Sequence, residues 1–263
     1  MRENTVRTKF QKGEAVVNGW LQIPSGVSAE VMAMAGFDSL TLDLQHGLLS
    51  YDTALPVLQA VSITQTIPIA RVPWNEPGII MKMLDAGSYG IICPMVNTAD
   101  ECAAFVRACR YPPKGYRSFG PTRASMYAGD GYAKNANDTV LTFAMIETAQ
   151  ALDNLDAILS VDGLDAIYVG PADLSQSLGG PPGADWEEGK AADAVLHIVE
   201  RAKAHGIYAG IHTGSVNYAR KMIEKGYQFV TLQSDLGFLR AKAQEIVDGM
   251  KDSSGKEEGS SPY

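Results

Sequence analysis

Two acidic residues follow apolar segments that have the composition of buried β-strands. The segment Thr139–Ile146 is followed directly by Glu147, and the segment Leu164–Gly170 ends three residues before Asp173. An unpaired buried charge is costly, so a strand gains no stability from an acid at its tip. Two carboxylates at the same end of a sheet suit a divalent ion such as Mg²⁺ or Mn²⁺ that keeps several waters. The alternative is that each acid caps the helix that follows it.

Other predicted strand ends carry a guanidinium, an imidazole and an aromatic ring. Arg71 could bind a carboxylate group through two hydrogen bonds, although a salt bridge to Asp43 or Glu147 is an equally good interpretation. His46 lies in a polar loop, and near neutral pH an imidazole is a natural general base. Trp20 lies near the end of the first predicted strand. These residue types together indicate acid–base chemistry on an anionic substrate.

The remaining histidines and the lysines narrow the choice of chemistry. His197 and His205 fall within helical patterns, whereas His212 follows the seventh predicted strand and is a candidate substrate contact. No lysine lies at a predicted strand end, where the apolar surroundings needed to lower the pKa of a Schiff-base lysine would be found. If the chain acts on a carbonyl compound, we therefore expect it to use a metal ion.

Short β-branched segments alternate with helical patterns along most of the chain, which favours βα units and a parallel sheet. The predicted strands lie near residues 15–21, 39–43, 67–71, 90–93, 140–146, 166–169, 207–210 and 229–232. The predicted helices lie near residues 28–35, 51–61, 78–84, 99–109, 151–160, 190–205, 216–224 and 238–250. Eight units in a chain of this length predict an α/β fold, a single-domain (β/α)8 TIM barrel over residues 1–251. An open, doubly wound sheet is the alternative, but no GxGxxG follows the first strand.

A barrel of this type would bring the polar strand ends together, because the carboxyl ends of all its strands meet at one rim. Two segments do not fit the alternating pattern. Residues 111–138 contain Pro, Gly and aromatic residues and are predicted to form a long loop with a functional or interface role. Residues 252–263 are rich in Ser, Gly, Lys and Glu and are predicted to be a disordered tail.

Composition excludes several classes of protein. The formal net charge is -8 and no dense Lys/Arg cluster is present, which argues against a nucleic-acid partner. No segment resembles a membrane span or a secretory signal, so we expect a cytoplasmic protein. The three cysteines show no CxxC spacing, which supports neither a disulfide framework nor a zinc site.

A series of short motifs resembles the metal-dependent, class II pyruvate aldolases of the HpcH/HpaI family, which include 4-hydroxy-2-oxoheptanedioate and 2-dehydro-3-deoxyglucarate aldolases. The resemblance runs from about Gly19 to about Ala243 and rests on many motifs in the right order rather than on any single one. The motifs are Ala35–Asp38, Asp43-x-x-His46-Gly47, Arg71–Asn75, Leu84–Gly87, Pro94–Val96, Arg110–Pro113, Gly115-x-Arg117, Ile146–Thr148 and Gly170–Ser175.

The resemblance implies a role for several of these residues. Glu147 and Asp173 would hold the metal ion, which could be Mg²⁺, Mn²⁺ or Co²⁺. Arg71 would bind the pyruvate part of the substrate and stabilise its enolate. His46 would be the base, and Asp85 would raise its basicity across a subunit boundary. The residues alone do not single out Asp85, which looks like an ordinary acid at a helix end.

The resemblance also implies substrate contacts and an assembly. The backbone of Ala172 would touch the substrate, and the family forms a hexamer, a trimer of dimers, in which a terminal helix is exchanged between subunits. Two positions differ from the family pattern. Met145 stands where many members have a substrate-contacting Gln, and Gln45 stands where many have Glu. Since methionine cannot donate an amide hydrogen bond, we expect the usual substrate to differ.

The expected reaction is therefore the reversible aldol cleavage of a 4-hydroxy-2-oxo acid to pyruvate, or a close 2-oxo acid such as hydroxypyruvate, and an aldehyde. We expect Trp20 and Met145 to contact the substrate together with Arg71, Ala172 and Asp173. One alternative is decarboxylation of oxaloacetate, or condensation of its enolate with another acceptor. A second, from a different class, is a non-catalytic barrel that binds a 2-oxo acid.

Overall fold

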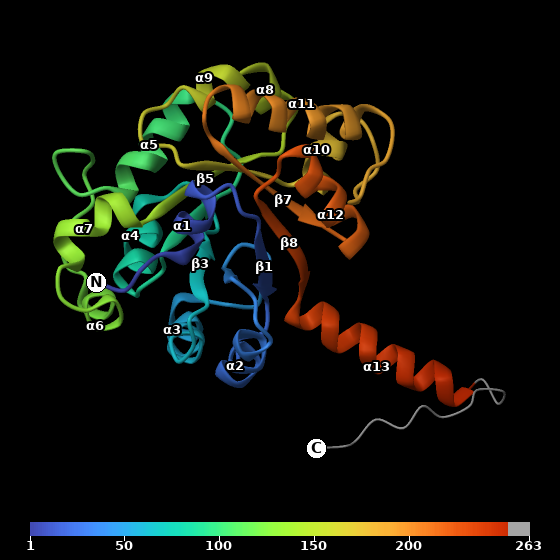
Figure 1. Cartoon of the computed structure of the whole chain (residues 1–263), viewed down its shortest axis with the longest axis horizontal. Coiled ribbons are helices and arrows are strands. Elements are labelled where there is room, and N and C mark those ends of the chain that lie inside the picture. Colours follow the sequence, from blue (N-terminus) through green and yellow to red (C-terminus); the bar gives the residue numbers. More distant parts are fainter. Residues whose placement is uncertain (252–263) are drawn as a thin grey trace.

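The computed structural model describes residues 1–251, which form a closed barrel of eight parallel strands surrounded by helices (Figure 1). Each strand pairs with the next in sequence, and the eighth closes on the first. The strands are β1 Val16–Leu21, β2 Ser39–Asp43, β3 Ile67–Arg71, β4 Gly90–Cys93, β5 Leu141–Ile146, β6 Ala166–Val169, β7 Tyr208–Thr213 and β8 Phe229–Ser234. The predicted (β/α)8 barrel is confirmed.

The strands are largely buried on both faces because one face lines the barrel interior and the other packs under the helices. Every residue of β2, β4, β5 and β6 is buried. The helices are α1 Thr5–Gln11, α2 Gly26–Met34, α3 Tyr51–Val61, α4 Pro77–Asp85, α5 Ala99–Cys109, α6 Thr122–Ala128, α7 Tyr132–Thr139, α8 Ala149–Asp153, α9 Leu155–Leu159, α10 Pro171–Ser177, α11 Lys190–Ala204, α12 Val216–Lys225 and α13 Asp235–Lys251.

The structure corrects the prediction for residues 111–138. This segment contains two short helices, α6 and α7, rather than a continuous loop. Gly129 and Gly131 separate them with backbone φ angles of 75° and 88°, a conformation that favours glycine. The helices α1 and α10, of seven residues each, were also not predicted. The predicted disordered tail, 252–263, lies outside the described residues.

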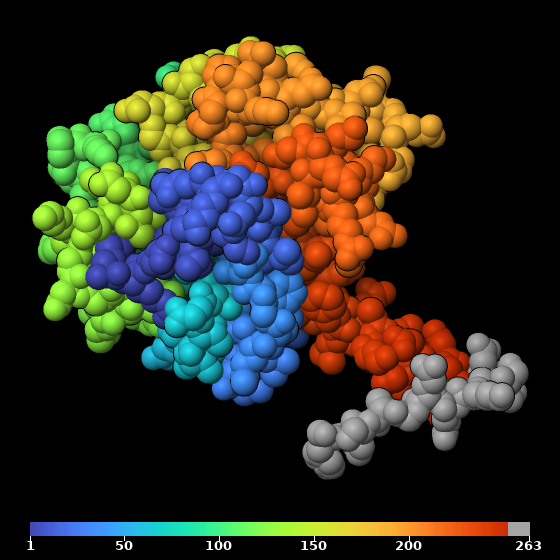
Figure 2. Space-filling model, viewed as in Figure 1, coloured from blue at the N-terminus to red at the C-terminus, as the bar shows by residue number. Residues whose placement is uncertain are grey.

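The N-terminal segment closes the barrel at the end opposite to the carboxyl ends of the strands. Phe10 stacks on Tyr208 with ring centroids 4.6 Å apart, and it packs edge-on against Phe143 and Phe229. The Asn4 side-chain amide donates to the carbonyl of Tyr89 at 3.2 Å. Figure 2 shows this segment covering the middle of the face in view. Access to the barrel interior is therefore from the other end.

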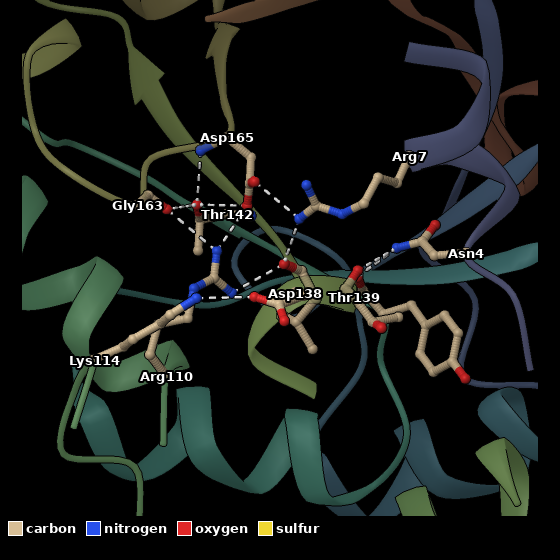
Figure 3. Close-up of polar contacts among 11 residues, drawn as sticks. Asn4, Arg7, Arg110, Lys114, Asp138, Thr139, Thr142, Gly163 and Asp165 are labelled. Atoms are coloured by element: carbon tan, nitrogen blue, oxygen red, sulfur yellow. Dashed lines mark hydrogen bonds and ion pairs between the residues drawn. The ribbon is translucent and has the colours of Figure 1, made fainter. Parts of the chain in front are cut away.

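A polar cluster fastens the same segment to the strands (Figure 3). Asp165, just before β6, accepts hydrogen bonds from Arg7 at 2.8 Å and from Arg110 at 2.7 Å. It also accepts from the backbone and side chain of Thr142 in β5. One carboxylate thus links α1, the end of α5 and two strands.

Helix α13 differs from the others because it projects away from the barrel (Figure 1). Only Asp235, its first residue, is buried. That carboxylate accepts hydrogen bonds from the backbone of Gln22 and Ile23 and from the hydroxyl of Ser28, so the base of the helix is fixed. Among residues 1–251, no helix has both the length and the apolar character needed to cross a membrane.

Candidate active site

A pocket of about 460 Å³ lies at the carboxyl ends of the barrel strands. It contains the candidate substrate contact His212 and seven of the eight other residues for which the sequence predicts a role in the site. Its lining residues are Trp20, Gln22, His46, Arg71, Met145, Glu147, Tyr168, Gly170, Pro171, Ala172, Asp173, Gly183, Ala184, His212, Thr213, Gly214, Gln233 and Ser234. The eighth, Asp85, lies elsewhere in the chain.

Glu147 follows β5 and is almost completely buried. One carboxylate oxygen accepts a 2.7 Å hydrogen bond from the backbone N–H of Met95, and the other faces Gly170. A Cβ atom at Gly170 would collide with that second oxygen, so glycine is needed there. Burial, together with the nearby charge of Asp173, raises the pKa of Glu147 to about 7, although Met95 and Arg71 act in the opposite direction. A positive ion beside Glu147 would therefore stabilise the ionised form of this carboxylate.

The helix-capping alternative is wrong for Glu147, because Thr148 caps α8 by accepting a hydrogen bond from the N–H of Ala151. Asp173 lies in the first turn of α10, whose N-cap residue, Gly170, has no side chain. Asp173 and its neighbour Ala172 are exposed to the pocket. The backbone around Ala172 therefore borders the space where a substrate would lie.

Arg71 ends β3 and pairs with Asp43 at the end of β2. Its Nε and Nη2 donate to the two oxygens of Asp43 at 2.9 Å and 2.7 Å. Burial raises the pKa of Asp43, but the hydrogen bonds and charge of Arg71 outweigh this effect and leave that pKa below its usual range. The Trp20 ring lies under the guanidinium, with the Cζ atom 4.8 Å from the ring centroid. Both interpretations of Arg71 are compatible, because a guanidinium has five donors and two serve Asp43.

His46 is exposed at the rim, in the loop after β2. Its backbone N–H donates to Asp43 at 3.2 Å, which fixes the loop that carries the imidazole. The next residue, Gly47, comes so close to the Asp43 carbonyl that a Cβ would collide with it. The strand end that orients Arg71 therefore also holds the backbone of His46.

Asp85 does not meet His46 within one chain. It ends α4, and its carboxylate pairs with the buried Arg117 at 2.6 Å. Burial raises the pKa of Asp85, although Arg117 opposes the shift. The role of Asp85 across a subunit boundary stays a prediction.

Met145 and Trp20 are almost fully buried in the floor of the pocket. The Trp20 ring stacks on Tyr168, with centroids 5.8 Å apart and an angle of 22° between the planes. Sequence reasoning missed Tyr168, which lies within β6 and carries a hydroxyl group among apolar neighbours. That single hydroxyl in an otherwise buried strand is the signal that could have identified it.

The donors in the pocket fit a divalent cation. Glu147 and Asp173 interact electrostatically, both line the cavity, and both offer oxygen ligands. Within residues 1–251 no cluster of three or more Asp, Glu, His or Cys side chains is arranged to hold a metal ion. Two carboxylates suit an ion that keeps waters and binds substrate oxygens, as Mg²⁺ does, rather than one enclosed by protein ligands.

Comparison with known proteins gives consistent results. The model of the HpcH/HpaI aldolase/citrate lyase family matches residues 19–241. A hydroxypyruvate/pyruvate aldolase of Rhizorhabdus wittichii is 43% identical over 244 residues, covering 93% of this chain and 97% of the relative. A 5-keto-4-deoxy-D-glucarate aldolase of an Enterobacter species is 37% identical over 250 residues, with coverage of 94% and 97%. The crystal structure of a family protein from Burkholderia cenocepacia is similar with a TM-score of 0.87 and 28% identity, covering 95% of this chain and 100% of that one.

Proposed function

The chain belongs to the HpcH/HpaI aldolase/citrate lyase family, and we propose that it cleaves a 4-hydroxy-2-oxo acid reversibly into pyruvate, or a close 2-oxo acid such as hydroxypyruvate, and an aldehyde. The bond that breaks joins two carbons, so the enzyme is a carbon–carbon lyase. The observation that carries this proposal is the meeting of Glu147, Asp173, Arg71 and His46 in one pocket. The names of the two aldolase relatives support the same chemistry.

Glu147 and Asp173 would hold a divalent ion, Mg²⁺, Mn²⁺ or Co²⁺. When bound, such an ion supplies Lewis-acid stabilisation of the negative charge that develops on the ketone oxygen of the 2-oxo acid. The two carboxylates also differ in burial, since Glu147 is enclosed and Asp173 is exposed to the pocket. Which of these ions is bound depends on the availability of each metal in the cell as much as on the type of ligand.

Arg71 binds the 2-oxo acid with the donors that Asp43 leaves free, and its positive charge favours the enolate. The two hydrogen bonds to Asp43 fix its orientation before substrate arrives, so little freedom is lost on binding. Trp20 packs against the same guanidinium and excludes water from one side. The backbone of Ala172 completes the contacts to the substrate.

His46 removes the proton from the 4-hydroxyl group as the carbon–carbon bond breaks and returns it in the synthetic direction. Its exposed position at the rim leaves the imidazole open to a neighbouring molecule. Asp85 from another subunit would raise its basicity. On the pocket floor, Met145 stands where many family members have a glutamine. This difference alters the substrate preference rather than the reaction.

The assembly that we propose is a homo-oligomer, a trimer of dimers with α13 exchanged between subunits. Supporting this, α13 exposes an apolar stripe that includes Leu239, Ile246 and Met250, with 63%, 58% and 82% of their surfaces accessible. A second stripe on α2 exposes Val27, Val31 and Met34. Large apolar side chains gathered in this way mark a surface that another chain covers.

The alternatives have weaker support. Relatives named as aldolases extend over more than nine-tenths of this chain. The oxaloacetate decarboxylase rests on the changed position at Met145, and the non-catalytic barrel rests on the changed positions at Met145 and Gln45. We place the enzyme in the cytoplasm, because its three buried cysteines are free, as in a reducing compartment.

The test is exchange of the pyruvate methyl protons in deuterated water with Mg²⁺ or Mn²⁺ present. Exchange follows enolate formation and needs no aldehyde. We expect Glu147→Ala or a chelator to reduce it at least about a hundredfold, the scale of losing one preorganised electrostatic group. Glu187→Gln, an exposed acid paired with Lys221 outside the pocket, is the matched control. Exchange that persists unchanged in Glu147→Ala contradicts the proposal.

A further inference from the structure

The pocket has two chemically different halves. Among the described residues, the charged side chains that line the pocket come from β3 and from the segments after β2, β5 and β6, whereas the lining side chains of β7, β8 and the end of β1 include no acid, arginine or lysine. Asp185 lies behind this second wall, where it accepts a hydrogen bond from the backbone N–H of Gly214. The polar side chains of this neutral wall are Gln22, His212, Thr213, Gln233 and Ser234. An aldehyde bound next to the 2-oxo acid would therefore meet hydrogen-bonding groups rather than charges.

His212 is held on this wall by a chain of buried hydroxyl groups. Its Nδ1 lies 3.1 Å from the Tyr168 hydroxyl, which donates its proton to Thr231 at 2.8 Å. Thr231 also accepts from the side-chain amide of Asn18 at 3.0 Å. Because the one proton of Tyr168 is given to Thr231, its oxygen accepts from His212, and the imidazole carries its proton on Nδ1.

The second ring nitrogen of His212, Nε2, is then a free acceptor. It has no hydrogen-bond partner among residues 1–251, and it is not among the fully enclosed unpartnered atoms, so it faces the cavity. Trp20 packs edge-on against the ring, with centroids 5.3 Å apart, and limits its rotation. Burial and the charge of Arg71 lower the pKa of His212 to about 4, so the ring is neutral at physiological pH.

We propose that the second substrate is a neutral, hydroxylated aldehyde and that His212 selects it, by accepting at Nε2 a hydrogen bond from a hydroxyl group of that aldehyde. This inference rests on the proposed aldol reaction and adds the class of its acceptor. Arg71 is the only arginine or lysine among the described lining residues, and it lies on the charged half, paired with Asp43. An aldehyde with its own carboxylate would therefore find no cation on the neutral wall.

The first test measures condensation of pyruvate with glycolaldehyde and with propionaldehyde, which differ by a hydroxyl in place of a methyl group. We expect wild type to favour glycolaldehyde in kcat/KM by about three- to tenfold, the size of one neutral hydrogen bond. In His212→Leu the ratio should fall to about one, and His212→Gln, which keeps an acceptor oxygen, should retain part of it. Because each ratio is taken within one variant, any loss of folded enzyme cancels.

Tyr168→Phe gives a second, independent variant. It keeps the ring that stacks on Trp20 but removes the hydroxyl that orients His212, so the preference for glycolaldehyde should again fall. A glycolaldehyde preference that is unchanged in both His212→Leu and Tyr168→Phe overturns the role of His212. No preference in the wild type overturns it as well.

The second test compares glyceraldehyde with tartronate semialdehyde, which carry a hydroxymethyl and a carboxylate group at the same position. We expect glyceraldehyde to be preferred at least about tenfold, and equal rates or the reverse preference overturn the class of acceptor. Pyruvate proton exchange, measured without aldehyde, separates this inference from the proposed function. Exchange with the wrong aldehyde preference rejects only the inference, whereas absent exchange rejects the proposed function.

Discussion

Gly170 is the residue on which the geometry of the Glu147 carboxylate depends most directly. It follows β6 directly and is the N-cap residue of α10, and the space that a Cβ would fill is taken by one oxygen of Glu147. The Met145 side chain would also lie only 3.0 Å from such an atom. A methyl group here would have to displace the carboxylate oxygen, which is the nearest atom, whereas the flexible end of Met145 could move aside.

We therefore expect Gly170→Ala to weaken Mn²⁺ binding at least about tenfold, or about 1.4 kcal/mol, with fold stability less affected. Isothermal titration calorimetry measures the affinity directly. Gly26→Ala is the matched control, because a Cβ at Gly26 makes only contacts of 3.4 Å or longer. Equal affinities in the two variants would show that Glu147 does not need the space beside Gly170.

The raised pKa of Glu147 predicts a pH effect on stability in chelator-treated protein. The carboxyl group ionises near 4.5 in the unfolded chain and near 7 in the folded protein. Between these values the folded state binds more protons, so the free energy of unfolding falls as the pH rises. At about 1.4 kcal/mol per pKa unit, the loss from pH 4 to pH 8 is about 3 kcal/mol.

Glu147→Gln should remove this component. Urea unfolding of both proteins across that pH range, always with chelator, gives the comparison, and the stability of wild type should fall relative to the variant as the pH increases. Parallel pH profiles would mean that the folded protein does not hold Glu147 in its protonated form near neutrality.

Met145 is proposed to contact the substrate, although the end of its side chain lies near the Glu147 carboxylate. We expect Met145→Gln to change the ratio of kcat/KM between pyruvate and hydroxypyruvate by about fivefold or more, the scale of one or two hydrogen bonds. Mn²⁺ affinity should change much less, and Met145→Leu is the control of similar volume without a donor. A large loss of metal affinity in Met145→Gln alone would place this residue with the ligands instead.

Sequence reasoning could identify site residues whose role follows from the end of a strand. Glu147 and Arg71 stand where an apolar segment stops and His46 lies in the loop just beyond one, and the barrel brings such positions together. The Tyr168–His212–Thr231 chain could not be found in this way. His212 and Thr231 lie 44 and 63 residues after Tyr168 in the sequence, and only the closed barrel makes the three residues neighbours.

Among the elements, α1 is fastened to the barrel by one carboxylate, Asp165 (Figure 3). It serves two guanidinium groups, Arg7 and Arg110, whose side chains are largely enclosed. Removing this acid leaves both guanidinium groups without their salt-bridge partner, although each still donates to a backbone carbonyl. The cost of an uncompensated buried charge is several kcal/mol.

Asp165→Ala should therefore reduce the free energy of unfolding by about 3 kcal/mol in urea titrations. Asp138→Ala is the control in the same cluster, because its pair with Lys114 is exposed and contributes less than about 1 kcal/mol. Losses of equal size would indicate that the cluster does not anchor the N-terminal segment.

The elements that the sequence did not predict share a physical reason. Helices α1, α6 and α7 have seven or eight residues, too few for an apolar period to stand out, and isolated helices of that length are unstable in water. They exist because they pack on the barrel: Phe10, Ala124 and Tyr132 are buried in one cluster at its closed end. The strands, by contrast, carry their pattern locally and were placed within a few residues.

At the scale of the whole molecule, α13 is the element that a single chain leaves incomplete. We expect light scattering to give the mass of a hexamer for the wild type. Leu239→Asp, on the exposed apolar stripe, should shift the mass to smaller species because the charge would be buried without a partner. Ala241→Asp introduces the same charge on the opposite side of the helix and is the matched control. A monomeric wild type, or equal masses for the two variants, would exclude assembly through α13.

The aromatic residues of the N-terminal segment close one end of the barrel, so ligands can enter and leave only at the carboxyl ends of the strands. The ligand that binds deepest in the pocket must leave last, because Phe10 and Tyr208 block the other end of the barrel. In the proposed cleavage reaction, the 2-oxo acid would lie deep beside Glu147 and Arg71, and the aldehyde would lie toward the opening. Product release would then be ordered, with the aldehyde leaving first. This order is imposed by α1, a helix that contacts neither product.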